Sequence, residues 1–278
     1  MTGTPLSGSC LCGAVCFEAG APEILGYCHC AICRKWTGAL FNTSLLVPRS
    51  RFRYVRGEEG VARFSREGSD RGHCRICGSS VPGGPLDGDW IGIPAGLLDA
   101  DPGLRPAGHL FVRSKVPWLE LDDALPRFET WVPGREPDWA RRDMGADRGP
   151  TVDWKTAEAQ PRGSCLCGAV RYELGSEPRR FVRCHCSRCR RATGSAYAAN
   201  LYFEPDRFRW TSGRESMARY DLPSARSFSN EFCTLCGSTM PHATRSGREM
   251  VVPTGTLDDD PGARIEGDLF PEDAPTWI

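Results

Sequence analysis

The chain has 278 residues, a length suited to two domains of ordinary size, and its 35 basic and 35 acidic residues leave no formal net charge. This balance argues against a nucleic-acid partner and against binding to a charged membrane surface. No apolar stretch reaches the ~20 residues that cross a bilayer, and the first residues show no basic segment leading into an apolar run. We therefore expect a cytoplasmic protein that does not bind membranes.

Most of the secondary-structure signal is strand. Short runs rich in β-branched and aromatic residues, bounded by Gly, Pro or Asp, predict strands, and only the segments after Cys30 and Cys186 look helical, briefly. Small, mainly antiparallel β domains follow from this pattern. In chain order the predicted strands are 14–18, 40–47, 51–55, 90–96, 109–112, 169–173, 197–203, 207–210 and 249–255.

The fifteen cysteines are an odd number, and most of them occur as C-x-C or C-x-x-C. Secreted disulfide frameworks are usually short chains with an even number of well-spaced cysteines. In a reducing compartment, cysteines at these short spacings are typical of metal ligands. The sequence therefore favours metal sites over disulfides.

The chain contains one domain copied in tandem, because four blocks recur in the same order. They are G-S-C-L-C-G-A-V at Gly8 and Gly163, C-H-C at Cys28 and Cys184, C-x-x-C-G at Cys74 and Cys233, and G-x-L-D at Gly96 and Gly255. We predict mainly β domains at 1–130 and 161–278, each organised around zinc sites.

A linker is predicted at 131–160, since this stretch is rich in Pro, Gly and charge. A short helix is expected near Trp139, and the tryptophans Trp131, Trp139 and Trp154 suggest that parts of the linker dock on a domain. The unpaired fifteenth cysteine, Cys16, is matched by Arg171 and is expected to be a packed thiol on a strand.

Four cysteines of each copy are predicted to form a closed metal site. A metal knuckle needs a tight turn after its second ligand, and Gly allows that turn, so C-x-C-G and C-x-x-C-G are predicted to be two halves of one site. Four thiolates leave no open position, which is typical of a structural zinc whose removal unfolds the domain. The predicted sets are Cys10, Cys12, Cys74 and Cys77, and Cys165, Cys167, Cys233 and Cys236.

The other three paired cysteines of each copy are predicted to form an open site. Three thiolates leave a tetrahedral zinc one ligand short, which is typical of a catalytic or substrate-binding ion, and such an ion can hold an incoming thiol as thiolate. The basic pairs 34–35 and 190–191 are expected to orient an acidic ligand or, slightly favoured, to screen the thiolates. The predicted sets are Cys28, Cys30 and Cys33, and Cys184, Cys186 and Cys189.

Other interpretations of these cysteines stay open. His29, His185 or a remote residue could supply a fourth ligand, although side chains adjacent on an extended segment point apart, so we expect His29 not to share the ion with both flanking cysteines. Oxidised cysteine pairs are a second alternative. Iron–sulfur ligation by the four-cysteine sets is a third, disfavoured because such clusters usually draw on a tighter run.

The motifs GSCLCGAV, CHCAICRKWTG, CRICGSSVP, GLLDADPG and GHLFVRSKVPW, in this order, resemble the glutathione-dependent formaldehyde-activating enzyme family, which also includes centromere protein V. The resemblance covers about residues 7–130 and 162–278. It implies a β-tent fold of small antiparallel sheets with two zinc ions per domain, the closed sets structural and the open sets, above all Cys28, Cys30 and Cys33, catalytic. It also implies the addition of glutathione to formaldehyde to give S-(hydroxymethyl)glutathione, a carbon–sulfur lyase reaction in reverse.

The second copy departs from the first at several positions around the open site. His109 is matched by Asp268, Lys115 by Ala274 and Arg71 by Asn230, and the second copy shows no counterpart of the segment 120–128. Another difference precedes Cys74, where the first copy has His73 and the second keeps the aromatic Phe232. We therefore expect the second copy to bind zinc with part of its pocket lost.

Three functions are compared. The favoured one is a zinc-dependent enzyme, a carbon–sulfur lyase acting on a small thiol and an aldehyde. The alternative is a non-catalytic tandem zinc-binding interaction module, for which the basic stretch Glu177–Arg191 could bind phosphate or an acidic protein, although charge runs are usually solvated faces. A redox or metal-storage role is disfavoured, because cysteine knuckles followed by Gly are usually inert.

Overall fold

The computed structural model describes residues 5–66, 69–84, 88–134, 154, 160–175 and 177–278. Regular structure in these ranges is mainly β and lies in several small, mostly antiparallel sheets, which confirms the predicted fold class. None of the helices in the described ranges has the length and apolar character needed to cross a membrane.

The first half of the chain forms three sheets. The strands are β1 (Leu6–Ser9), β2 (Cys16–Ala19), β3 (Ile24–Cys28), β4 (Asn42–Pro48), β5 (Phe52–Arg56), β6 (Val61–Arg66), β7 (Ser69–Cys74), β8 (Ser80–Val81), β9 (Trp90–Pro94) and β10 (His109–Leu110), with 3-10 turns η1 (Arg49–Arg51), η2 (Glu58–Gly60), η3 (Ala95–Leu97) and η4 (Val112–Ser114). Their orders are β1-β2-β5, β10-β3-β4-β9 and β6-β7-β8. β10 runs parallel to β3, because the long connection after β9 returns the chain in the same direction.

The second half repeats this arrangement. Its elements are β11 (Arg162–Ser164), β12 (Arg171–Leu174), β13 (Arg180–Cys184), β14 (Ala198–Phe203), β15 (Phe208–Ser212), β16 (Met217–Asp221), β17 (Ser229–Cys233), β18 (Thr239–Met240), β19 (His242–Ala243), β20 (Met250–Pro253) and β21 (Gly267–Leu269), with η5 (Pro205–Arg207), η6 (Arg214–Ser216), η7 (Thr254–Thr256) and η8 (Pro271–Asp273). The sheet orders are β11-β12-β15, β19-β20-β14-β13-β21 and β16-β17-β18.

Strand β10 is shorter than predicted for a local reason. The sequence suggests a strand over 109–112, but Phe111 adopts a left-handed backbone (φ 56°) that ends β10 after two residues. Phe270 has the same conformation (φ 54°) after β21, so the two halves share this turn.

Within the described ranges, the two α-helices follow the C-H-C segments, as predicted. They are α1 (Ala31–Thr37) and α3 (Ser187–Thr193). Cys30 is the N-cap of α1, and its sulfur accepts a hydrogen bond from the helix backbone. Each helix ends at a glycine in the left-handed conformation, Gly38 (φ 71°) and Gly194 (φ 74°), which other residues adopt only with strain.

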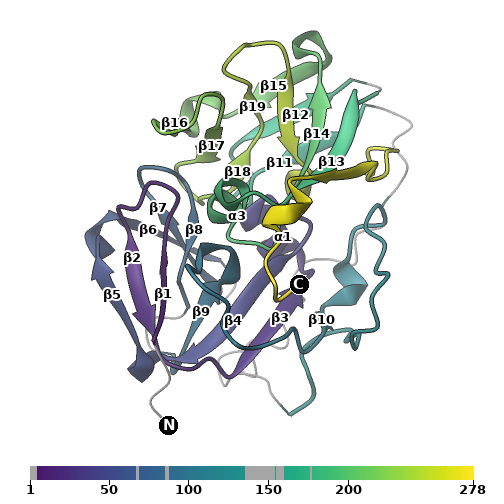
Figure 1. Ribbon diagram of the computed structural model, residues 1–278. Helices are drawn as coiled ribbons and strands as arrows, with labels where there is room; N and C mark the ends of the chain where they lie inside the picture. Colours follow the sequence, from purple (N-terminus) through teal and green to yellow (C-terminus); the bar gives the residue numbers. More distant parts are fainter. Residues whose placement is uncertain (1–4, 67–68, 85–87, 135–153, 155–159, 176) are drawn as a thin grey trace.

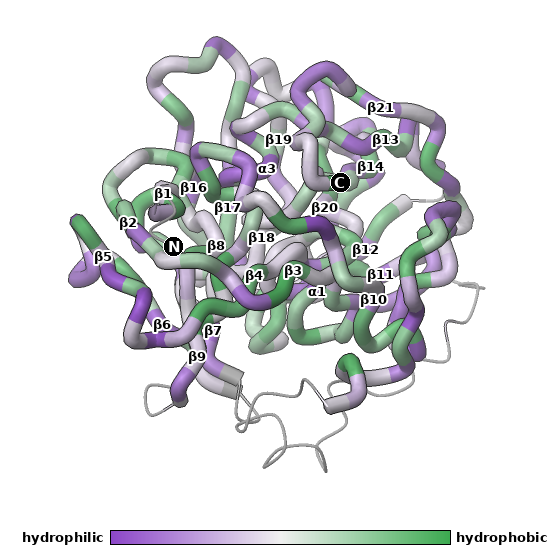
Figure 2. The backbone as a smooth tube through the Cα atoms, turned by 60° about the horizontal axis from the view of Figure 1, so that its bottom comes forward, coloured by the Kyte–Doolittle hydropathy of each residue, from purple (hydrophilic) through white to green (hydrophobic). Residues whose placement is uncertain are grey.

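The two halves pack against each other at these helices, which Figure 1 shows where the purple-to-blue half meets the green-to-yellow half. The contacts are reciprocal: Gly255 N donates to Gly38 O, and Gly96 N donates to Gly194 O, both at 2.9 Å. Buried apolar residues of both halves form one continuous cluster, while many of the most hydrophilic residues lie on outer loops (Figure 2). The copies therefore share a core.

The glycines of the C-x-x-C-G knuckles, Gly78 and Gly237, lie in this interface. A Cβ on Gly78 would lie 2.3 Å from the Phe232 ring, and a Cβ on Gly237 would lie 2.5 Å from the His73 ring. His73 and Phe232 also contact each other, with ring centroids 5.9 Å apart. The residue before the third closed-site cysteine of each copy thus packs on the knuckle of the other copy.

The predicted linker lies largely outside the described residues, as does the short helix expected near Trp139. Two of its tryptophans do dock, as expected. Trp131 packs edge-on against Phe111 at 5.5 Å, and Trp154 packs against Trp118 at 4.9 Å.

Arg191 on α3 provides a testable ion pair of this interface. It donates to Asp99 Oδ1 at 2.7 Å and to Ser9 Oγ at 2.6 Å. Desolvation opposes ionisation of Asp99, but the hydrogen bonds from Arg191 and Ser7 outweigh it and lower the pKa of this carboxyl. Because the folded pKa lies below the unfolded value, the stabilisation is present above about pH 4 and is lost as the pH falls through the folded pKa.

Asp99→Asn is therefore expected to lower the free energy of unfolding by at most about 1 kcal/mol at pH 7, since the Asp99 side chain is 45% exposed and solvent screens the pair. Urea unfolding at pH 7 and pH 3 measures this, with Asp206→Asn on an exposed turn as the control. An equal loss at both pH values would contradict the ion-pair explanation.

Candidate metal centres

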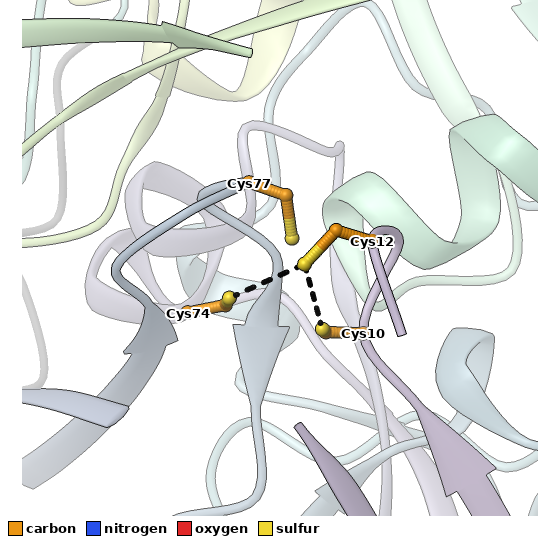
Figure 3. Close-up of side chains that lie close together, drawn as sticks. All are labelled: Cys10, Cys12, Cys74 and Cys77. Atoms are coloured by element: carbon orange, nitrogen blue, oxygen red, sulfur yellow. Dashed lines mark hydrogen bonds between the residues drawn. The ribbon is translucent and has the colours of Figure 1, made fainter. Parts of the chain in front are cut away.

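The structure brings the four predicted closed-site cysteines of each copy together. Their sulfurs all lie within 4.8 Å of one another in both copies. Figure 3 shows the first group, in which Cys10 and Cys12 from the turn after β1 meet Cys74 at the end of β7 and Cys77 in the turn that follows. The Cys10–Cys12 sulfur distance is 3.4 Å and the Cys12–Cys74 distance is 3.8 Å.

These donor sets fit a tetrahedral zinc ion. Zinc–sulfur bonds of ~2.3 Å place tetrahedral sulfurs about 3.8 Å apart, close to the distances observed here. Val15 N donates to Cys10 Sγ at 3.3 Å, and Val170 N donates to Cys165 Sγ at 3.3 Å, as backbone groups do around thiolates. The hydrogen bond between Cys10 and Cys12 lowers the pKa of Cys12 and raises that of Cys10, so a cation is needed to hold all four as thiolates.

The three open-site cysteines of each copy also converge. The Cys28 and Cys30 sulfurs are 3.5 Å apart, and the Cys184 and Cys186 sulfurs are 3.6 Å apart. Among the described residues, no further His, Cys, Asp or Glu joins either group. All fifteen cysteines are unbridged, so the oxidised-pair alternative finds no support in this structure. These groups could hold a metal ion and leave one position for a guest.

The two open groups differ in exposure. Cys28, Cys30 and Cys33 are all buried, whereas Cys189 in the second group is partly exposed. The residue before the last cysteine contributes to this difference, because Ile32 is buried and its counterpart Arg188 is exposed.

His29 lies between two predicted ligands but binds elsewhere, as expected. Its Nε2 lies 2.9 Å from His109 Nδ1, and His109 Nε2 lies 2.9 Å from Asp123 Oδ2. Burial lowers the pKa of His29 to about 3, so its ring is neutral near pH 7. In the neutral form of His109, its Nε2–H donates to Asp123 and its Nδ1 accepts from His29, which leaves His29 Nδ1 as a buried acceptor without a partner among the described residues.

The second copy makes the corresponding contact in a shorter form. Asp268, which takes the place of His109, lies 2.8 Å from His185 Nε2 and also pairs with Arg183. The departures noted from the sequence therefore do not all remove pocket contacts. In the second copy the Asp268 carboxylate contacts His185 directly, whereas in the first copy His29 reaches the Asp123 carboxylate through His109.

Arg34 and Lys35, which were expected to orient an acidic ligand or to screen the thiolates, point at the second half of the chain, although the Arg34 charge still interacts with Cys30. Neither directs its terminal donors to the thiolates or to a guest position. Arg34 is fully buried and Nη1 donates to Gly255 O and Leu257 O of the second half, at 2.7 and 3.0 Å. Lys35 Nζ donates to Ser164 Oγ at 2.6 Å. Adjacency in sequence suggested proximity to the thiolates, but the helical turn of α1 points these side chains at the other copy.

Arg71, one of the pocket positions at which the two copies differ in sequence, donates a hydrogen bond to the open group, a contact that the sequence analysis did not assign. Its Nη2 donates to Cys33 Sγ at 3.3 Å, and its guanidinium lies 5.2 Å from the centre of the Trp36 ring. The mismatch with Asn230 was the one available signal in the sequence.

Fold and site together define a class of protein: small β domains that each combine a closed four-cysteine group with an open three-cysteine group. A family model described as "Glutathione-dependent formaldehyde-activating enzyme" matches residues 5–114 and 160–273, most of the chain. The chain belongs to the glutathione-dependent formaldehyde-activating enzyme family.

Two known proteins are similar to parts of the chain. A protein of Halomonas elongata named "Putative glutathione-dependent formaldehyde-activating enzyme" is 34% identical over 129 residues, with 42% of this chain and 78% of that protein covered. A crystal structure of a Rhodobacter sphaeroides protein is 27% identical, with a TM-score of 0.31, and the match covers 39% of this chain and 99% of that one.

Proposed function

We propose that this chain is a zinc-dependent carbon–sulfur lyase-type enzyme that forms or cleaves the adduct of a small thiol and an aldehyde, such as S-(hydroxymethyl)glutathione. The observation that carries the proposal is the convergence of Cys28, Cys30 and Cys33 in an open group, in a domain that also has a closed group able to hold a structural ion. The family membership of the chain and the name of its Halomonas relative support the same reaction class.

The reaction balances without a redox partner. In the forward direction the thiol sulfur bonds to the carbonyl carbon, and the thiol proton ends on the carbonyl oxygen; cleavage reverses both changes. Zinc held by Cys28, Cys30 and Cys33 would supply a position at which a thiol is stabilised as thiolate.

The chain's own residues prepare that position. Burial of the three cysteines excludes water, which strengthens electrostatic contacts at the site. Arg71 offsets negative charge beside Cys33. The contacts from Asp123 through His109 fix the orientation of the His29 ring between two of the cysteines.

Thiol binding by the cobalt-substituted full chain tests the proposal. In a Cys189→Ser chain only the first open group is intact. Addition of glutathione to this cobalt-substituted chain is expected to change the cobalt–thiolate absorption bands. Exchange NMR with labelled formaldehyde should then show faster adduct interconversion than a protein-free control, a necessary comparison because thiols and formaldehyde also combine unaided. Unchanged cobalt bands at saturating glutathione would contradict the proposal.

The interaction-module alternative gains little from the structure. The basic stretch Glu177–Arg191 is largely occupied by internal contacts. Its paired arginines are Arg180 with Glu249, Arg183 with Asp268, Arg190 with the His185 carbonyl, and Arg191 with Asp99.

A further inference from the structure

The two open groups each have an arginine nearby, but at different positions. In the first copy it is Arg71 on β7, with Nη2 against Cys33 Sγ. In the second copy the matching residue is Asn230, whose Nδ2 donates to Cys77 O of the first copy at 2.8 Å and so turns away from its own open group. There Arg188 on α3, which is exposed, interacts with Cys186. The helix arginines Arg190 and Arg34 each interact electrostatically with the open group of their own copy, so they do not distinguish the two groups.

Contacts with neighbouring residues hold the Arg71 side chain in place and leave its Nε–H without a hydrogen-bond partner among the described residues. Its Nη1 donates to Asp70 O at 3.2 Å, and its guanidinium packs over Trp36. This Nε atom is buried. A guanidinium stays protonated at every relevant pH, so Arg71 places a fixed positive charge against Cys33 Sγ.

The charge balance of the two groups therefore differs. A divalent ion with three thiolates keeps one net negative charge, which repels an anionic guest. Arg71 cancels that charge from a partly buried position, where Coulomb interactions are weakly screened. Arg188 acts from an exposed position, where solvent and salt weaken its effect.

We propose that Arg71 is a specificity-determining residue that makes the first open group the site for negatively charged thiols, while the second group shows little preference by charge. This inference rests on the proposed function, because it concerns the guest of the same site. The guest class is a thiol that carries a carboxylate besides its sulfur. The spare Nε–H of Arg71 is the donor that would contact such a guest.

The test compares two probe thiols on the cobalt-loaded full chain. Glutathione is anionic near pH 7 and cysteamine is cationic, and both are titrated by the change in cobalt absorption. Cys189→Ser isolates the first open group, and Cys33→Ser isolates the second. The preference for glutathione over cysteamine is the ratio of their affinities. We expect this ratio to be about 10- to 100-fold larger at the first group than at the second, as one added charge at ~6 Å predicts.

Substitutions at the two arginines complete the test. Arg71→Asn, which copies the second half, is expected to remove most of this preference, and Arg71→Lys is expected to retain part of it. Arg188→Ile, which copies the first half, should change the preference of the second group by less than about 3-fold. If Arg71→Asn disturbs folding, the charge preferences of the two isolated groups, measured in chains that keep Arg71, still test the inference.

The outcomes separate this inference from the proposed function. Equal charge preference at both groups, or equal weakening of glutathione and cysteamine by Arg71→Asn, would overturn the role of Arg71 while thiol binding stands. Failure of every thiol to perturb cobalt would overturn both.

Discussion

Cys77→Ser is expected to unfold the first copy of the domain. Cys77 is fully buried and completes the four-sulfur group that joins the turn after β1 to the turn after β7. Structural zinc sites contribute apparent binding free energies of about 10–16 kcal/mol, as much as the whole stability of about 5–15 kcal/mol of a typical domain. Loss of one ligand therefore removes most of what holds these two turns together.

The effect should extend to the second copy, because Asn230 donates to the Cys77 carbonyl and Phe232 packs on Gly78. Circular dichroism and zinc content per chain measure the result. Cys16→Ser is the matched control, since Cys16 is outside every cysteine group and is expected to leave both quantities nearly unchanged. A folded Cys77→Ser protein with a full complement of zinc would show that this group has no structural role.

Cys33→Ser is expected to abolish activity and leave the fold intact. Serine is nearly isosteric with cysteine but is a poor zinc ligand, so the first open group should lose its ion while the closed group keeps its own. Substitutions of residues that merely support a metal ligand already cost about 10- to 100-fold, so loss of a ligand should cost at least about 100-fold.

The matched variant is Cys189→Ser in the second copy. With four zinc ions expected per chain, each variant should lose one, and circular dichroism should not change. Activity that survives in Cys33→Ser and disappears in Cys189→Ser would move catalysis to the second copy. Loss of fold in Cys33→Ser equal to that in Cys77→Ser would refute the division into closed and open groups.

Much of the candidate site could be predicted from local sequence, because its geometry is local. Cysteines two or three positions apart can present their sulfurs to one centre with little help from the rest of the fold. The glycine after each knuckle shows where the backbone must turn, and Gly13 and Gly78 both adopt φ of 74°. Both cysteine motifs recur in the second half of the chain. This recurrence indicated that C-x-C-G and C-x-x-C-G of one copy form one site.

The parts that could not be predicted depend on where side chains of distant elements point. Lys35 and Arg71 illustrate this. Lys35 follows the open group directly and binds the other copy, whereas Arg71 lies 38 positions away from Cys33 and contacts its sulfur. Sequence distance does not report such contacts, since the direction of a helix face and the pairing of strands decide them.

The sequence by itself determined the mainly β class, the recurrence of four motif blocks, and the two kinds of cysteine group, because periodicity, repeats and short ligand spacing are properties of contiguous residues. Only the tertiary structure decided that Arg34 and Lys35 join the two copies, that Arg71 donates to Cys33 of the first open group, and that Asp268 takes over the contact of His109. These contacts arise from the packing of elements that are far apart in the chain, and packing is set by the whole fold at once.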